Sequence, residues 1–208
     1  MNEFDHKAAT WDANPMHAER AKAVAQAIRE MIPLNKTLHA LEYGCGTAQL
    51  SFELKDDLKD ITLMDSSFEM IEVVKNKIAG SGATNLFPLF FDFEKEEYNL
   101  RHFDLIYTQM VLHHVSDTEE FIKKFFNLLN GKGFLAVADL YLEDGSFHDS
   151  SFTGHKGFDP EKLMKMFKEI GFSSARYKTC FTINKSFENG ETKNFPVFLL
   201  TAFKDLFY

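Results

Sequence analysis

The residues most able to do chemistry gather in a short segment in the first quarter of the chain. Glu42 ends an apolar run, and Gly44 and Gly46 follow it with one residue between them. Glycine permits backbone angles that a Cβ atom forbids, and it lets a ligand approach the main chain closely. The helix expected to begin at Gln49 would present unpaired N–H groups and a partial positive charge to an anionic group. The pattern therefore predicts a strand, a glycine turn and a helix that together bind a ligand.

Two carboxylates follow later apolar runs and could contact a nucleotide. Asp65 ends the run at residues 61–64, roughly 20 residues after the glycine turn. An acid at this place in a strand–helix–strand unit can accept hydrogen bonds from both hydroxyls of a ribose. Asp65 could instead cap the helix that begins near Phe68, but capping would not explain the glycines. Asp92 ends the run at residues 86–91, where it could also cap the turn that follows.

The glycine pattern distinguishes two classes of nucleotide-binding protein. A dinucleotide fingerprint, G-x-G-x-x-G, would need a third glycine where this chain has Gln49. The chain has E-x-G-x-G-x-A instead, formed by Glu42, Gly44, Gly46 and Ala48. This motif resembles the first loop of the class I S-adenosylmethionine (SAM)-dependent methyltransferases, which is typically D/E-x-G-x-G-x-G. Ala48 departs from the family pattern at the last glycine.

The resemblance implies which residues bind the cofactor SAM, whose product is S-adenosylhomocysteine (SAH). It implies that Asp92 accepts a hydrogen bond from the adenine amino group, while the backbone N–H of Phe93 meets a ring nitrogen. Glu42 would order the loop and the amino end of the methionine moiety. The predicted cofactor-binding residues are Glu42, Gly44, Cys45, Gly46, Asp65, Ser66, Asp92, Phe93 and Gln109.

Two adjacent histidines follow the fourth apolar run and are the candidates for catalysis. His113 or His114 could accept a proton from a nucleophile near neutral pH, while the other histidine packs inside the protein. Neighbouring residues do not share a helical face, so the two are not expected to form a metal-binding pair.

The segment at residues 141–158 interrupts the alternation of strands and helices and is the predicted substrate loop. His148 and His155 are its candidate substrate contacts, although both could be plain loop residues. With Asp149 they would make only a thin ligand set, and no metal is predicted.

These candidate residues can form one site only if the fold brings them to the same edge of a sheet. Apolar runs alternate with amphipathic helices, which predicts an α/β protein with a Rossmann-like, doubly wound, seven-stranded sheet, mostly parallel. The β runs at 172–183 and 195–203 predict a C-terminal antiparallel hairpin, which resembles the methyltransferase sheet. Ligands of such sheets bind at the carboxyl ends of the strands. The glycine turn, the acids and the substrate loop should therefore meet at one mouth.

Residues 1–31 are the predicted N-terminal lid and helix. Phe4 and Trp11 could lie over the cofactor or substrate, or could tether the segment to the sheet edge. The opening F-D-x-x-A-x-x-W-D resembles the leader of several small-molecule methyltransferases, and Trp11 is a candidate substrate contact. Arg20, on the helix that follows, could reach the carboxylate of SAM.

Composition limits the class of protein. The 208 residues suit one domain, residues 1–208. With 31 acidic and 23 basic residues the net charge is −8, so neither nucleic acid nor an anionic membrane is expected as a partner. Two cysteines, no apolar signal core and no run of transmembrane length predict a cytoplasmic protein. The sequence does not indicate an oligomeric state.

The predicted function is methyl transfer from SAM to an unidentified acceptor, a small molecule. One alternative is a non-catalytic SAM-binding module that senses the ligand or binds a partner protein. A less favoured alternative is an NAD(P)-dependent oxidoreductase, against which the missing third glycine and the terminal hairpin argue.

Overall fold

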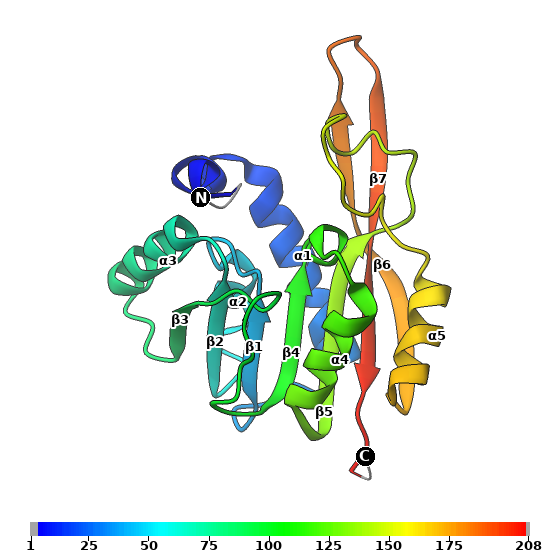
Figure 1. Cartoon of the computed structure of the whole chain (residues 1–208). Helices are drawn as coiled ribbons and strands as arrows, with labels where there is room; N and C mark the ends of the chain where they lie inside the picture. The colour runs from blue at the N-terminus through cyan, green and yellow to red at the C-terminus, as the bar shows by residue number, and fades with distance from the viewer. Residues whose placement is uncertain (1–3, 207–208) are drawn as a thin grey trace.

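The computed structural model describes residues 4–206, so residues 1–3 of the predicted lid and residues 207–208 of the predicted domain lie outside it. A seven-stranded sheet in the order β3-β2-β1-β4-β5-β7-β6 forms the centre of the molecule (Figure 1). The first five strands are parallel, and β7 runs antiparallel to both β5 and β6. The predicted sheet and C-terminal hairpin are confirmed. The strands are β1 (His39–Tyr43), β2 (Asp60–Asp65), β3 (Leu86–Phe90), β4 (Phe103–Gln109), β5 (Leu129–Leu140), β6 (Ser174–Ser186) and β7 (Thr192–Phe203).

Helices cover both faces of the sheet. The buried residues of α1, α2 and α3 pack in one hydrophobic cluster, and those of α4 and α5 pack in a second cluster on the opposite face. Side chains alternate between the faces of a strand, so neighbouring residues such as Leu105 and Ile106 fall into different clusters. The helices are η1 (Asp5–Ala13), α1 (Pro15–Met31), α2 (Gln49–Leu54), α3 (Phe68–Ser81), η2 (Leu112–His114), α4 (Thr118–Leu128) and α5 (Pro160–Ile170). Among the described residues, no helix is both long enough and apolar enough to cross a membrane.

Several helices begin or end at residues that cap their free backbone groups. The carboxylates of Asp117 and Asp159 accept from the first turns of α4 and α5, and Gly171 ends α5. The helix expected to begin at Gln49 does begin there, and α2 stops at Leu54. Arg29 donates to the carbonyl of Glu53 at 2.6 Å, so a distant side chain satisfies a helix-end oxygen.

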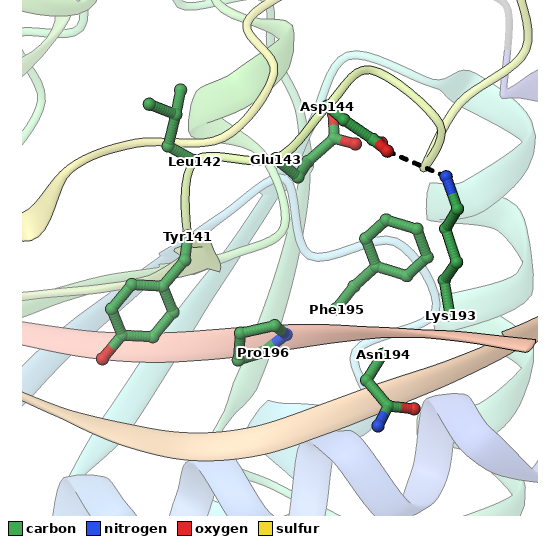
Figure 2. A pocket seen from close by; sticks show the side chains of 8 residues that line it. All are labelled: Tyr141, Leu142, Glu143, Asp144, Lys193, Asn194, Phe195 and Pro196. Atoms are coloured by element: carbon green, nitrogen blue, oxygen red, sulfur yellow. Dashed lines mark hydrogen bonds and ion pairs between the residues drawn. The ribbon is translucent and has the colours of Figure 1, made fainter.

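Two long segments extend past the carboxyl edge of the sheet (Figure 1). The β6–β7 hairpin projects beyond the other strands, and the segment at 141–158 lies beside it. Figure 2 shows how this segment is anchored: Asp144 meets Lys193 of β7 at 2.8 Å, above the ring of Phe195. Lys185 of β6 donates to the carbonyl of Phe147 at 2.5 Å. The hairpin therefore holds the predicted substrate loop in place. A hollow of about 400 Å³ lies at this anchor, between the loop and β7.

Candidate active site

A cavity of about 910 Å³ opens at the carboxyl ends of β1, β2 and β4. Its walls come from η1, α1, the glycine turn, η2 and the segment at 141–158. The structure brings together all but one of the residues predicted for the site. Those that line the cavity are Trp11, Glu42, Gly44, Cys45, Gly46, Asp65, Ser66, Asp92, Gln109, His113, His114, His148 and His155. A volume near the upper end of the range for small-molecule sites, about 300–1,000 Å³, leaves room for a cofactor and a small acceptor.

The glycine turn needs its two glycines for different reasons. Gly44 has φ +64, and a Cβ atom there would lie 2.3 Å from a methyl group of Val111. Gly46 has φ +52, with the indole Nε1 of Trp11 as the nearest atom to an added Cβ, at 3.9 Å. Glycine at position 44 therefore lets the turn pack against Val111, whereas glycine at position 46 leaves the main chain accessible from the cavity. Ala48 has φ 61, a conformation in which glycine is free of strain.

Asp65 ties the turn to the second strand. Its carboxylate accepts hydrogen bonds from the backbone N–H of Gly46 at 2.7 Å and of Ser67 at 2.8 Å. Burial raises the pKa of Asp65, and these backbone donors oppose the shift. The capping alternative for Asp65 is wrong, because the hydroxyl of Ser67 caps α3 by accepting from Met70.

Asp92 and Phe93 differ in where they point. Asp92 lines the cavity, and it also binds the turn that follows, accepting from the backbone N–H of Glu94 at 3.1 Å and from Lys95 at 2.6 Å. Phe93 is the predicted residue that does not line the cavity. Its ring is buried in the core against Tyr43 at a centroid distance of 5.5 Å.

Glu42 is a carboxyl group buried at the end of β1. It is 3% exposed and accepts a hydrogen bond from the hydroxyl of Ser51. The same hydroxyl is hydrogen-bonded to the hydroxyl of Tyr107, at 2.5 Å between the two oxygens. Burial raises the pKa of Glu42 to about 8. The group is therefore largely protonated at neutral pH when nothing occupies the cavity.

The N-terminal segment closes one side of the cavity. Asp12 accepts hydrogen bonds from Thr47 at 2.6 Å and Gln49 at 2.7 Å, beside the glycine turn, and pairs with Lys77 at 2.9 Å. Phe4 and Trp11 line the cavity, with their ring centroids 6.2 Å apart. Polar contacts thus hold this segment across the mouth.

Arg20 is a buried cation in the cavity wall. It is 5% exposed, and burial lowers its pKa to about 10, so it stays charged at neutral pH. Within residues 4–206 its Nε atom has no hydrogen-bond partner, while Nη1 makes only a 3.8 Å contact with the sulfur of Met16. A buried guanidinium needs an anion or other acceptors, so this one is suited to bind an anionic group in the cavity.

Three histidines meet in the wall of the same cavity. The ring centroids of His113 and His114 lie 4.3 Å apart, and that of His148 lies 5.0 Å from His113. Burial lowers the pKa of His114 to about 3 and that of His148 to about 4, so both rings are neutral near pH 7. The two adjacent histidines were not expected to share a helical face, yet their rings lie close together. The two stand at the end of the short turn η2, not along an α-helix, and the substrate loop brings His148 to them.

Asp139 is the functional residue that sequence reasoning missed. It is fully buried on β5 and accepts from Nδ1 of His113 at 2.7 Å and from the backbone N–H of His113 at 3.2 Å. An acid inside the apolar run at 134–140 is a signal, because a buried carboxylate needs a partner. The sequence could not name that partner, since it lies 26 residues away.

Comparison with known proteins gives the family. Residues 34–194 match a family described as a methyltransferase domain. An uncharacterized methyltransferase of Schizosaccharomyces pombe is 29% identical over an alignment of 153 residues that covers 65% of this chain and 53% of that protein. A carboxy-S-adenosyl-L-methionine synthase of Campylobacter lari is 24% identical over 132 residues, 62% of this chain and 54% of that one. The chain spans about half the length of these curated relatives.

Solved structures share the fold at low sequence identity. A chain in the complex between the Haloferax volcanii Trm112 methyltransferase activator and a putative methyltransferase has a TM-score of 0.78 and 15% identity, and 99% of each chain is covered. A phosphoethanolamine N-methyltransferase 2 of Haemonchus contortus, in complex with phosphomonomethylethanolamine and SAH, has a TM-score of 0.69 and 14% identity. That match covers 87% of this chain and 52% of the other.

The strand order, the terminal antiparallel strand and the glycine turn define the fold of the class I SAM-dependent methyltransferases. This chain belongs to the methyltransferase domain family. The prediction that the chain belongs to a methyltransferase family is thereby confirmed, and the family gives no support to the NAD(P)-dependent alternative.

Proposed function

We propose that the cavity holds SAM against the glycine turn and that the remaining space, toward the three histidines, takes a small-molecule acceptor. The contacts assigned to SAM follow the wall of the cavity: Asp65 for the ribose, Asp92 for the adenine amino group, and the turn with Glu42 for the methionine moiety. Trp11, His148 and His155 are the proposed contacts of the acceptor.

The reaction is a displacement at carbon. A lone pair on an acceptor atom attacks the methyl carbon, the carbon–sulfur bond breaks, and its electron pair stays on sulfur to give SAH. Any proton on the acceptor atom leaves to a base or to water. Because the sulfonium is already activated, the protein mainly has to align the two reactants and exclude water. The segment held by Asp12 and the anchored substrate loop are suited to that exclusion.

The observation that carries the proposal is Arg20. It is a buried cation with an unsatisfied N–H group in the wall of a cavity that also contains the glycine turn and two acids. SAM carries a carboxylate on its methionine moiety, so Arg20 is the group proposed to bind it.

A pair of ligands tests this assignment. SAH has the carboxylate, whereas 5′-methylthioadenosine keeps the adenosine and the sulfur but lacks the amino-acid portion. A charge-assisted hydrogen bond contributes about 1.5–3 kcal/mol, so Arg20→Met should weaken SAH about tenfold or more in a calorimetric titration. The affinity for 5′-methylthioadenosine should stay the same.

Arg29→Met, at a half-exposed position on the same helix, is the matched control and should bind SAH as the unaltered protein does. Equal losses for both ligands in Arg20→Met, or no loss for either, would contradict the assignment.

Catalysis needs its own measurement. Incubation with isotopically labelled SAM and a small-molecule extract should give labelled small molecules together with an equal amount of SAH. Tight SAH binding without turnover on any fraction would favour the alternative of a non-catalytic SAM-binding module.

A further inference from the structure

Three imidazole side chains lie close together in the wall of the cavity. One ligand atom from each of His113, His114 and His148 can be chosen so that all three lie within 4.8 Å of one another. A tetrahedral zinc ion, with Zn–N bonds of about 2.0–2.1 Å, holds its nitrogen ligands about 3.4 Å apart. Binding of an ion would draw the three nitrogens, which already lie within 4.8 Å of one another, to that spacing.

His113 is oriented as a metal ligand would be. Its Nδ1 donates to the buried carboxylate of Asp139 at 2.7 Å, which leaves Nε2 as the nitrogen with a free lone pair. Asp139 also accepts from the backbone N–H of His113, so both the ring and its turn are fixed. A carboxylate behind a ligating imidazole is the usual outer partner of zinc-bound histidines.

His148 brings its nitrogen from another part of the chain. Within the described residues its Nε2 is a buried atom with no hydrogen-bond partner. The ring is stacked on Phe152 with centroids 3.8 Å apart. The backbone N–H of His155 donates to the carbonyl of His113 at 2.8 Å, and a Cβ atom on Gly154 would lie 2.3 Å from that same oxygen. The loop therefore packs directly against η2, and a glycine occupies the position of closest contact.

We infer that His113, His114 and His148 form a site for one divalent transition-metal ion of the zinc class, in the wall of the cavity. Three imidazoles suit zinc and cobalt and leave a fourth coordination position for a ligand. Asp139 behind His113 and Asp149 beside His148 supply negative charge near the ion, which offsets the positive charge of Lys185 and Lys7 near His148.

The role of the ion rests on the proposed function. The three histidines line the cavity, so an ion held by them would bind an oxygen or sulfur atom of the acceptor there. A bound cation lowers the pKa of such a group, so the acceptor gives up its proton to solvent and keeps a lone pair for the methyl carbon. In this arrangement the imidazoles hold the ion, and none of them acts as the base.

Cobalt titration of the full chain tests the site directly. Protein freed of metal with a chelator is titrated with Co²⁺, and the visible d–d absorption and its end point are followed; Zn²⁺ affinity is measured by competition with a chromophoric chelator. We expect about one equivalent bound per chain. His148→Gln and His114→Gln should each lose about tenfold or more in affinity for both ions.

His155→Gln is the matched control, because it removes an imidazole from the same loop and the same cavity that is not one of the three clustered rings. It should bind Co²⁺ with unchanged affinity. SAH titration of His148→Gln, with circular dichroism to verify folding, separates this proposal from the previous one, since the variant should still bind SAH. No Co²⁺ binding by the unaltered chain, or equal binding by His148→Gln and His155→Gln, would overturn the metal site even if SAH binds as expected.

Discussion

The buried carboxyl group of Glu42 makes the stability of the fold depend on pH. In the unfolded chain the pKa of this carboxyl group is near 4.5, and in the folded protein burial raises it to about 8. Between these values the folded state binds more protons than the unfolded state. The free energy of unfolding that Glu42 contributes is therefore full below pH 4.5 and declines as the pH rises toward 8.

Glu42→Gln removes this dependence. Urea unfolding without ligand at pH 5 and at pH 8 should show the unaltered protein losing roughly 2–4 kcal/mol relative to the variant, at about 1.4 kcal/mol per pKa unit. Glu53→Gln, an exposed position on α2, is the control and should follow the unaltered protein. Parallel pH profiles for the unaltered protein and Glu42→Gln would show that Glu42 is ionised in the folded state.

Residues whose role is local could be predicted from the sequence. Gly44, Gly46 and Asp65 each follow an apolar run, so a position along the chain was enough to place them at the mouth. Arg20 was expected to reach the carboxylate of SAM, but its burial, like the role of Asp139, depends on contacts with distant segments, which no local pattern contains. The meeting of the histidines was missed for the same reason, because His148 reaches His113 only through the folded loop.

At the scale of elements, the N-terminal segment is held by a few polar contacts. Asp12 binds Thr47, Gln49 and Lys77 from a partly exposed position, so solvent reduces the strength of each contact. Asp12→Ala should let the segment open more often and speed the dissociation of SAH several-fold.

Stopped-flow displacement of SAH measures that rate. Asp56→Ala, which removes an exposed carboxylate paired with its neighbour Lys55, is the control and should leave the rate unchanged. If Asp12→Ala also left it unchanged, the segment would be a fixed wall and not a lid.

Helix ends are set locally where capping residues mark them. Asp117, Asp159 and Gly171 fix the ends of their helices in this way. The two glycines at 131 and 133 would locally favour a turn, yet both lie in β5, which begins at Leu129. There Asn130 donates to Asp104 on β4 at 2.8 Å, so a neighbouring strand and not the local glycines decides the conformation.

Across the whole molecule, a bound ligand should stabilise the fold by mass action. SAH at about a hundredfold excess over its dissociation constant adds about 2.7 kcal/mol, because it binds the folded state only. For a chain of this size the melting temperature should then rise by roughly 5–10 °C. Differential scanning fluorimetry with SAH, and with NADH as the unrelated nucleotide, provides the test. A shift with NADH alone would contradict the assigned cofactor.

The strand order also constrains how the protein is made. β7 is synthesised last of the seven strands, yet it lies between β5 and β6. Within the described part of the chain, β6 pairs with no strand other than β7. A nascent polypeptide on the ribosome can therefore assemble the half of the sheet from β3 to β4 early, while β6 must wait for the final strand. The hairpin that anchors the predicted substrate loop is thus completed late in biosynthesis, and a nascent chain cannot finish the proposed acceptor site until translation has passed β7.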